Sequence, residues 1–307
     1  MMGYLRALLS PAYWRHGFSV ARAASALLSA FGGLWLLVET SSFFSAQLGE
    51  LFRAYWAVFL MLGLVLAACQ NRPRHYATSR LAGRDVTIEI RVGDIFSLPG
   101  ALVIGATTTF ETDIAHGLIS ARSVQGQFTE RFYDAVSYLN ADLAGALASV
   151  TSDGTRAGTR GKTVAYPIGT TVRVVARGRP AYFVAIASLN EHGVAHASFD
   201  DLKTSLPQLW EAVATKGDFE RLVMPVLGSG FARLPQTREE IIRETVKSFA
   251  AACSSVRPTE ALTIVMPYAD FYEHRVDLPE LERYLQHVSR YTEYRQPGAQ
   301  GAGQAVT

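Results

Sequence analysis

The fold of this chain is decided by the stretch RLVMPVLGSGF, residues 221–231. It opens as an almost continuous apolar run, which is typical of a strand buried on both faces of a parallel sheet. Gly228, Ser229 and Gly230 follow at once, and glycines in such a turn let backbone N–H groups approach a bound anion. A simple tight turn uses the same residue types. Because ligands of open α/β sheets bind beyond the carboxyl ends of the strands, this turn is the first candidate site.

Strands and helices alternate along the chain on both sides of this stretch. Apolar runs typical of strands lie at residues 86–90, 101–106, 163–168, 172–176, 182–187 and 261–267. Helical patterns cover residues 128–147, 202–215, 241–253 and 277–289. Thr237 and Glu240 have the spacing of a capping box at the start of the third helix. The alternation predicts a three-layer α/β/α domain over residues 81–290, with a mixed, largely parallel sheet.

A second group of candidate residues follows the strand-like run that ends in ALVIGA. Thr107 and Thr108 come directly after this run. Ser123, Gln125 and Gly126 stand just before a helical pattern, where the first N–H groups of a helix favour negative charge. These residues predict a second anion-binding turn.

Two apolar segments precede the domain, at residues 19–38 and 54–70. Apart from Arg22 at the edge of the first, neither is charged, and each approaches the roughly 17 to 25 residues that a helix needs to cross a bilayer. Trp56 near the start of the second segment favours the membrane interface. We expect a membrane anchor over residues 1–70, built as a transmembrane helical hairpin. Core helices of a soluble protein are the alternative.

The charges around these segments predict their orientation. The loop between them carries Glu39, Glu50 and a single arginine, Arg53, whereas the basic residues that flank the pair are Arg6, Arg15, Arg72, Arg74 and Arg80. The positive-inside tendency then puts both termini in the cytoplasm. We expect a multi-pass protein of the cell inner membrane with a basic linker at 71–80, and a disordered tail at 291–307, where Gly, Ala and Gln dominate.

Composition excludes several classes of function. Hydrophobic residues make up 49% of the chain, and the excess lies in its N-terminal part. A net charge of +2 without clustered basic residues argues against nucleic acid as a partner. The two cysteines are too few for a disulfide framework. His192 and His196 have zinc-like spacing, but no third ligand is evident, so we expect no metal.

The order of the motifs resembles the macro domain, an ADP-ribose-binding fold. Gly-Asp-Ile at 93–95 follows the first strand, the PVLGSG motif ends at Gly230, and VMPY at 265–268 ends the last strand. The resemblance covers residues 86–289. With two apolar segments in front, the chain resembles the ThsA-type transmembrane effectors of type II Thoeris anti-phage systems. In that family a TIR-domain partner makes a histidine-linked ADP-ribose, which the macro domain senses.

The resemblance implies roles for the candidate residues. Asp94 is expected to accept a hydrogen bond from the adenine amino group, with the backbone of Ile95 beside it. Tyr268 or Phe271 is expected to lie against the distal ribose. The residues expected around the diphosphate come from the two turns, Ser123, Gln125 and Gly126 on one side and Gly228, Ser229, Gly230 and Phe231 on the other. Thr107 and Thr108 complete the expected ligand-binding set.

Departures from the macro-domain pattern bear on activity. Hydrolytic macro domains place asparagines after the second strand and three glycines in the next turn. This chain has threonines at 107–109 and Ser-Val-Gln-Gly at 123–126. The resemblance therefore implies a receptor without catalytic residues or cofactor, and a membrane-tethered ADP-ribosyl hydrolase is the alternative. In such a receptor, ligand binding leads to homo-oligomerisation, membrane disruption and abortive infection.

Overall fold

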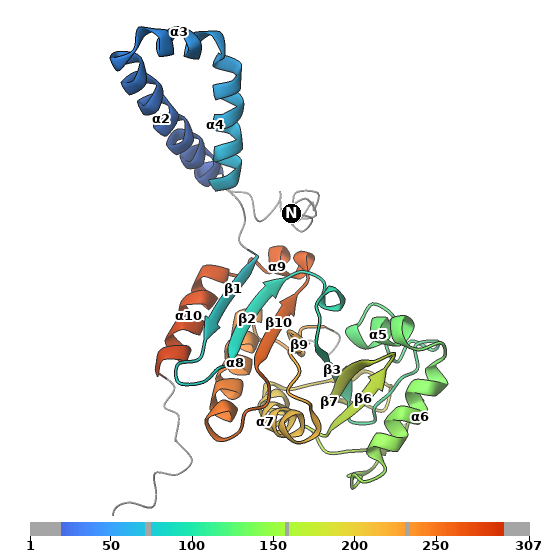
Figure 1. Ribbon diagram of the computed structural model, residues 1–307. Coiled ribbons are helices and arrows are strands. Elements are labelled where there is room, and N and C mark those ends of the chain that lie inside the picture. Colours follow the sequence, from blue (N-terminus) through green and yellow to red (C-terminus); the bar gives the residue numbers. More distant parts are fainter. Residues whose placement is uncertain (1–19, 71–74, 157–159, 231–233, 292–307) are drawn as a thin grey trace, which may run out of the picture. The chain divides into compact units, whose positions relative to one another are not determined.

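The computed structural model describes residues 20–70, 75–156, 160–230 and 234–291. The chain divides into two compact units, Met1–Arg74 and His75–Thr307. Both are drawn in Figure 1.

The N-terminal unit consists of helices α2 (Val20–Phe44), α3 (Ala46–Ala54) and α4 (Trp56–Gln70). Ala26 and Ala30 of α2 form a small buried cluster with Ala67 of α4. Gly63 lies so close to α2 that a Cβ atom there would stand 2.4 Å from the Phe31 ring. Small side chains therefore allow the two long helices to pack closely.

The two apolar segments do not form equal helices. Ala23–Phe44 is long and apolar enough to cross a membrane, as signal sequences and the buried core helices of soluble proteins also can be. The second segment forms the 15-residue α4, which is about 22 Å long at about 1.5 Å per residue. It is long enough to count as a possible span only together with α3, and the two helices are bent by 77° relative to each other. The break falls at Tyr55, so the expected span at 54–70 is shorter than a bilayer core as a single helix.

The C-terminal unit is built on one mixed sheet with the strand order β1-β2-β10-β9-β3-β7-β6, and β8 pairs with β7 at one end. Its strands are β1 (Tyr76–Arg80), β2 (Thr87–Val92), β3 (Ala101–Thr107), β6 (Thr171–Ala176), β7 (Arg179–Leu189), β8 (Ala195–His196), β9 (Leu222–Pro225) and β10 (Ala261–Met266). In this order the central strands β2, β10, β9, β3 and β7 are parallel to one another. The outer strands β1, β6 and β8 pair with their neighbours in antiparallel fashion. Two short strands, β4 (Gly154–Thr155) and β5 (Val164–Ala165), pair separately. The prediction of a mixed, largely parallel sheet is confirmed.

Helices cover both faces of this sheet (Figure 1). They are α5 (Val124–Phe132), α6 (Val136–Leu147), α7 (Phe199–Lys216), α8 (Arg238–Ser255), α9 (Tyr268–Glu273) and α10 (Leu278–Tyr291), with a short 3-10 turn, η2, at Ile95–Ser97. Helix α8 packs against both α7 and α10, while α5 packs on β3 and α6 packs on β6. Phe128 and Leu139 anchor α5 and α6 in a core shared with Leu102 and Ile104 of β3. The chain thus forms the expected three-layer α/β/α domain.

Local sequence signals are confirmed at the helix starts. Thr237 and Glu240 form the predicted capping box of α8, and Ser198 with Asp201 caps α7 in the same way. The Asp277 carboxylate accepts a hydrogen bond from the N–H of Glu280 at the start of α10.

Two expected segments differ in the structure. The helix predicted at 128–147 is two helices, because the chain is extended at Tyr133, whose hydroxyl donates to Asp142 at 2.7 Å. Residues 76–80 of the expected linker form β1, which pairs with β2 in antiparallel register. Val92 also donates its N–H to the carbonyl of His75 at 2.7 Å, so the sheet pairing begins before residue 81. The expected tail at 291–307 lies outside the described residues, apart from Tyr291.

Candidate ligand-binding site

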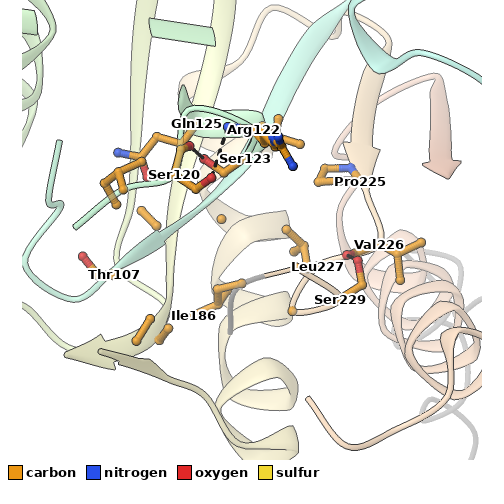
Figure 2. Close-up of a pocket in the computed structure, with 18 of the residues that line it drawn as sticks. Thr107, Ser120, Arg122, Ser123, Gln125, Ile186, Pro225, Val226, Leu227 and Ser229 are labelled. Atoms are coloured by element: carbon orange, nitrogen blue, oxygen red, sulfur yellow. Dashed lines mark hydrogen bonds between the residues drawn. The ribbon is translucent and has the colours of Figure 1, made fainter. Parts of the chain in front are cut away.

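A cavity of about 910 Å³ opens beyond the carboxyl ends of β3, β7, β9 and β10 (Figure 2). Its lining residues come from the end of β3, from the segment before α5, from the β8 region and from the turn after β9. Ala269, Asp270 and Glu273 of α9 complete the wall. The cavity therefore lies where parallel α/β sheets place their ligands.

The turn after β9, residues 226–230, forms one wall and is called the glycine turn below. Gly228 has φ +76°, and a Cβ atom there would stand 2.3 Å from Leu234, so only glycine fits without strain. The carbonyl of Gly228 accepts the N–H of Leu234 at 3.1 Å, and Ser229 donates its hydroxyl to the carbonyl of Val226 at 2.6 Å. Within the described parts of the chain, the N–H groups of Gly228 and Gly230 have no acceptor. They are therefore available to an anion.

The opposite wall is the turn Ser123–Gly126, called the α5 turn below. The Ser123 hydroxyl donates to the carbonyl of Ser120 at 2.6 Å and accepts the N–H of Gly126 at 3.0 Å, which makes it the N-cap of α5. A Cβ atom on Gly126 would stand 2.3 Å from the same carbonyl, so the turn is closely packed. The first N–H groups of α5, on Val124 and Gln125, have no acceptor inside the helix. This helix end favours negative charge.

The structure brings together six of the residues expected from the sequence. The shared feature is that all line the same cavity, and they are Thr107, Ser123, Gln125, Gly228, Ser229 and Gly230. Gly126 is the last residue of the α5 turn but does not line the cavity, and Thr108 is buried, donating its N–H to the carbonyl of Ala187 at 2.7 Å. Phe231 lies outside the described residues.

Other expected residues do not line the cavity. Asp94 caps η2, with one carboxylate oxygen 3.0 Å from the N–H of Phe96 and the other 3.7 Å from Arg131 Nη1. Ile95 is buried in the core beside it.

Tyr268 and Phe271 lie on the side of α9 that faces away from the cavity wall. The ring of His75 is 5.2 Å from that of Tyr268 and 6.3 Å from that of Phe271, and its Nε2 is 2.7 Å from the hydroxyl of Tyr272. Since residues 269, 270 and 273 line the cavity, α9 has one face on the cavity and one on the first residue of the C-terminal unit.

Three charged residues of the cavity wall are not among the residues expected from the sequence. Arg122 stands directly before the α5 turn, and Asp270 and Glu273 come from α9. Arg122 could have been found from its position next to Ser123, because cations commonly accompany anion-binding turns. Nothing in the local sequence distinguishes Asp270 or Glu273 from ordinary surface residues.

The family model for the macro domain of Thoeris protein ThsA matches residues 88–267, from β2 to the end of β10. The chain belongs to this family. Thoeris protein ThsA of Bacillus amyloliquefaciens (strain Y2) is 24% identical over 161 residues, which cover 51% of this chain and 52% of that protein. The chain thus spans about half the length of the curated relative it matches.

Solved macrodomains of Oceanobacillus iheyensis are similar in structure. One point mutant shares 15% identity at a TM-score of 0.47, covering 70% of this chain and 97% of that one. Another mutant, solved with ADPR, shares 13% identity at a TM-score of 0.46, covering 69% of this chain and 100% of that one.

In this ThsA-type macro domain, a buried carboxylate organises the loop after β3. Glu111 is 2% exposed, and it accepts N–H bonds from Thr112 at 2.8 Å, Asp113 at 3.0 Å and Lys162 at 2.6 Å. Burial lowers the pKa of the Lys162 ammonium, and the charge of Glu111 opposes that shift. The carbonyl of Glu111 accepts from the Gln125 amide at 2.5 Å, so this loop also supports the α5 turn.

The threonines that follow β3 are bonded mainly to one another and to this loop. The hydroxyls of Thr107 and Thr109 are 3.2 Å apart, and Thr107 Oγ1 accepts the N–H of Glu111 at 3.2 Å. Thr107 lines the cavity, whereas Thr109 is buried. The end of β3 therefore presents a hydroxyl in a fixed position at the cavity wall.

Proposed function

We propose that this cavity binds ADP-ribose or an ADP-ribose derivative, with the diphosphate between the glycine turn and the α5 turn. The observation that carries the proposal is the pair of turns itself. Each offers backbone N–H groups without acceptors in the described parts of the chain, and both line one cavity at the carboxyl ends of parallel strands. Membership in the ThsA macro-domain family supports the choice of ligand. Arg122, in the same wall, supplies a positive charge for the diphosphate.

The ends of the ligand are assigned by the same proposal. Asp94, which stands outside the cavity lining, accepts from the adenine amino group through the carboxylate oxygen that does not cap Phe96 and that lies 3.7 Å from Arg131 Nη1. Ile95 contributes its backbone beside it, and Phe231, which lies outside the described residues, is proposed as a further residue of the diphosphate site. Tyr268 or Phe271 reaches the distal ribose only if α9 rotates, since both now pack on His75.

The domain acts as a receptor rather than as an ADP-ribosyl hydrolase in this proposal. Its cavity presents threonine at the end of β3, and the Thr107 hydroxyl already has two partners, Thr109 and Glu111. Incubation with ADP-ribosylated protein distinguishes the two functions. A receptor leaves the modification in place, and release of free ADP-ribose at catalytic rates would establish the hydrolase.

The N-terminal unit anchors the receptor in the cell inner membrane, with both termini in the cytoplasm. Large apolar side chains on α2 support this proposal, since Leu28, Trp35 and Phe43 are each more than half exposed. The signal is a nucleotide such as histidine-ADP-ribose, made by a TIR-domain partner, and its binding drives homo-oligomerisation, membrane disruption and abortive infection. A ligand moves such an equilibrium from about 1:99 to 99:1 only if it binds the assembled state about 10⁴-fold more tightly.

Calorimetry with ADP-ribose on the full-length chain tests the binding proposal. Gly230 lines the cavity, and a Cβ atom there would meet nothing within 4 Å, so the Gly230→Val variant should fold. Its added methyl groups stand where the ligand is expected, and ADP-ribose affinity should fall at least about tenfold, which corresponds to about 1.4 kcal/mol.

The matched control is Gly145→Val. Gly145 lies on α6, away from the cavity, and it too has nothing within 4 Å of an added Cβ. This variant should bind ADP-ribose like the unchanged protein. The proposal fails if the unchanged protein does not bind ADP-ribose, or if both variants bind it equally well.

A further inference from the structure

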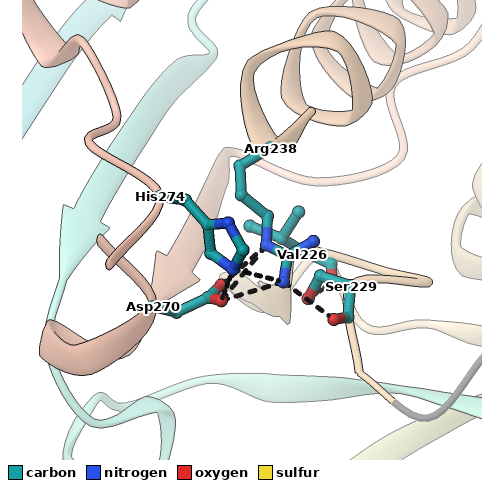
Figure 3. Close-up of polar contacts among 5 residues, drawn as sticks. All are labelled: Val226, Ser229, Arg238, Asp270 and His274. Carbon is teal, nitrogen blue, oxygen red and sulfur yellow. Dashed lines mark hydrogen bonds and ion pairs between the residues drawn. The ribbon is translucent and has the colours of Figure 1, made fainter. Parts of the chain in front are cut away.

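One arginine outside the cavity joins the glycine turn to two helices (Figure 3). Arg238 is the first residue of α8, and its side chain is 12% exposed. Its Nε lies 3.0 Å from Oδ2 of Asp270 and 3.2 Å from Oδ1, and its Nη2 lies 2.9 Å from Oδ1. The same Nη2 donates to the carbonyl of Ser229 at 3.0 Å. The guanidinium group thus holds α8, α9 and the glycine turn together.

The position of this arginine is unfavourable for the helix that carries it. A helix N-terminus bears partial positive charge, which disfavours a cation in the first turn. The carboxylate of Asp270 compensates the charge, and His274 Nε2 lies near both partners, 3.1 Å from Arg238 and 3.2 Å from Asp270. Helix stability therefore does not explain Arg238, whereas its contact with the turn does.

The contact fixes the direction of one peptide group. In a trans peptide the C=O and N–H bonds point in opposite directions, so holding the Ser229 carbonyl turns the Gly230 N–H away from Arg238. Gly230 lines the cavity, and Arg238 does not. We infer that Arg238, anchored by Asp270, is a positioning residue that keeps the Gly230 N–H directed at a diphosphate group in the cavity. This inference rests on the binding proposed above.

Positioning and simple electrostatics predict opposite effects for one substitution. Asp270 lines the cavity, so its negative charge repels a diphosphate there. If charge alone matters, Asp270→Asn should tighten ADP-ribose binding. If Asp270 serves to hold Arg238 on Ser229, the same substitution should weaken binding, because an amide offers the guanidinium one acceptor oxygen in place of two.

The experiment measures the Kd of ADP-ribose by calorimetry on the full-length chain, below the melting temperature of each variant. We expect Arg238→Gln to raise Kd about tenfold and Asp270→Asn to raise it about threefold, as for the loss or weakening of a charged hydrogen bond. Arg238→Lys should also raise Kd, because an ammonium group cannot reproduce the planar fork.

The control is Arg243→Gln, on the same helix. Arg243 also pairs with a carboxylate, that of Glu280, but it lies outside the cavity. A loss of helix stability alone would affect both arginine variants, whereas positioning affects only those at Arg238. A lower Kd for Asp270→Asn, or an unchanged Kd for Arg238→Gln, overturns the inference while leaving the binding proposal intact. If the unchanged protein does not bind ADP-ribose, both are overturned.

Discussion

The two turns that face each other across the cavity are built in different ways. The α5 turn is held mainly by local bonds of the Ser123 hydroxyl to the carbonyl of Ser120 and the N–H of Gly126, with one longer-range bond from the Gln125 amide to the carbonyl of Glu111. The glycine turn is held from further along the chain, by the N–H of Leu234 and by Arg238 of α8. The comparison teaches that one cavity combines a wall held mainly by bonds between near neighbours in the sequence with a wall held by residues further along the chain.

The largest effect is expected where the local turn has no room to adjust. In Gly126→Val, the new Cβ would stand 2.3 Å from the carbonyl oxygen of Ser120 and 2.8 Å from the Cα of Ala121. These backbone atoms cannot rotate away, so we expect the free energy of unfolding to fall by about 3 kcal/mol, and ADP-ribose binding to be lost. Urea denaturation checks the first effect and calorimetry the second. A variant as stable as the unchanged protein contradicts a rigid α5 turn.

A smaller effect is expected in the glycine turn. Gly228→Ala places a methyl group at φ +76°, 2.3 Å from a terminal methyl of Leu234. The left-handed backbone costs about 1–2 kcal/mol, whereas the leucine side chain can move. Urea denaturation of Gly228→Ala and of the double variant Gly228→Ala, Leu234→Ala separates these causes. If Gly228→Ala costs no stability in the Leu234→Ala background, contact with the Leu234 side chain and not backbone strain is responsible for the loss.

The smallest effects compare the two serine hydroxyls. Ser123→Ala removes the cap of α5 and should lower the free energy of unfolding by about 1 kcal/mol. Ser229→Ala removes one bond to Val226, and the N–H of Ser229 still bonds the same carbonyl at 3.3 Å. We expect a loss of about 0.5 kcal/mol. Thermal denaturation of both variants ranks them, and a greater loss for Ser229→Ala would reverse the comparison.

The sequence predicted what short-range contacts determine. The capping box of Thr237 with Glu240 spans three residues and is confirmed. The parallel strands and the macro-domain order were readable from apolar runs and the turns that follow them. The family match then confirmed the resemblance to ThsA.

The sequence could not predict contacts between distant residues. Arg238 and Asp270 are 32 positions apart, and no local motif around either residue indicates that they form an ion pair. One of the three N–H groups that donate to the Glu111 carboxylate belongs to Lys162, 51 residues away. The sequence alone instead suggests a solvent-exposed acidic loop. The sequence of β1 gives no apolar run, because this strand lies at the sheet edge and belongs to a basic segment. The packing of the His75 ring on Tyr268 and Phe271 is a contact of the same kind, because about 190 residues separate them in the sequence.

Helix α9 contacts the cavity with one face and the beginning of the C-terminal unit with the other. One face carries Asp270 and Glu273 into the cavity wall, and the other carries the rings that surround His75. The helix is only six residues long, so the same two turns of backbone carry both sets of side chains. A rotation of α9 in response to an occupant of the cavity would therefore also change the contacts of the His75 ring with Tyr268, Phe271 and Tyr272.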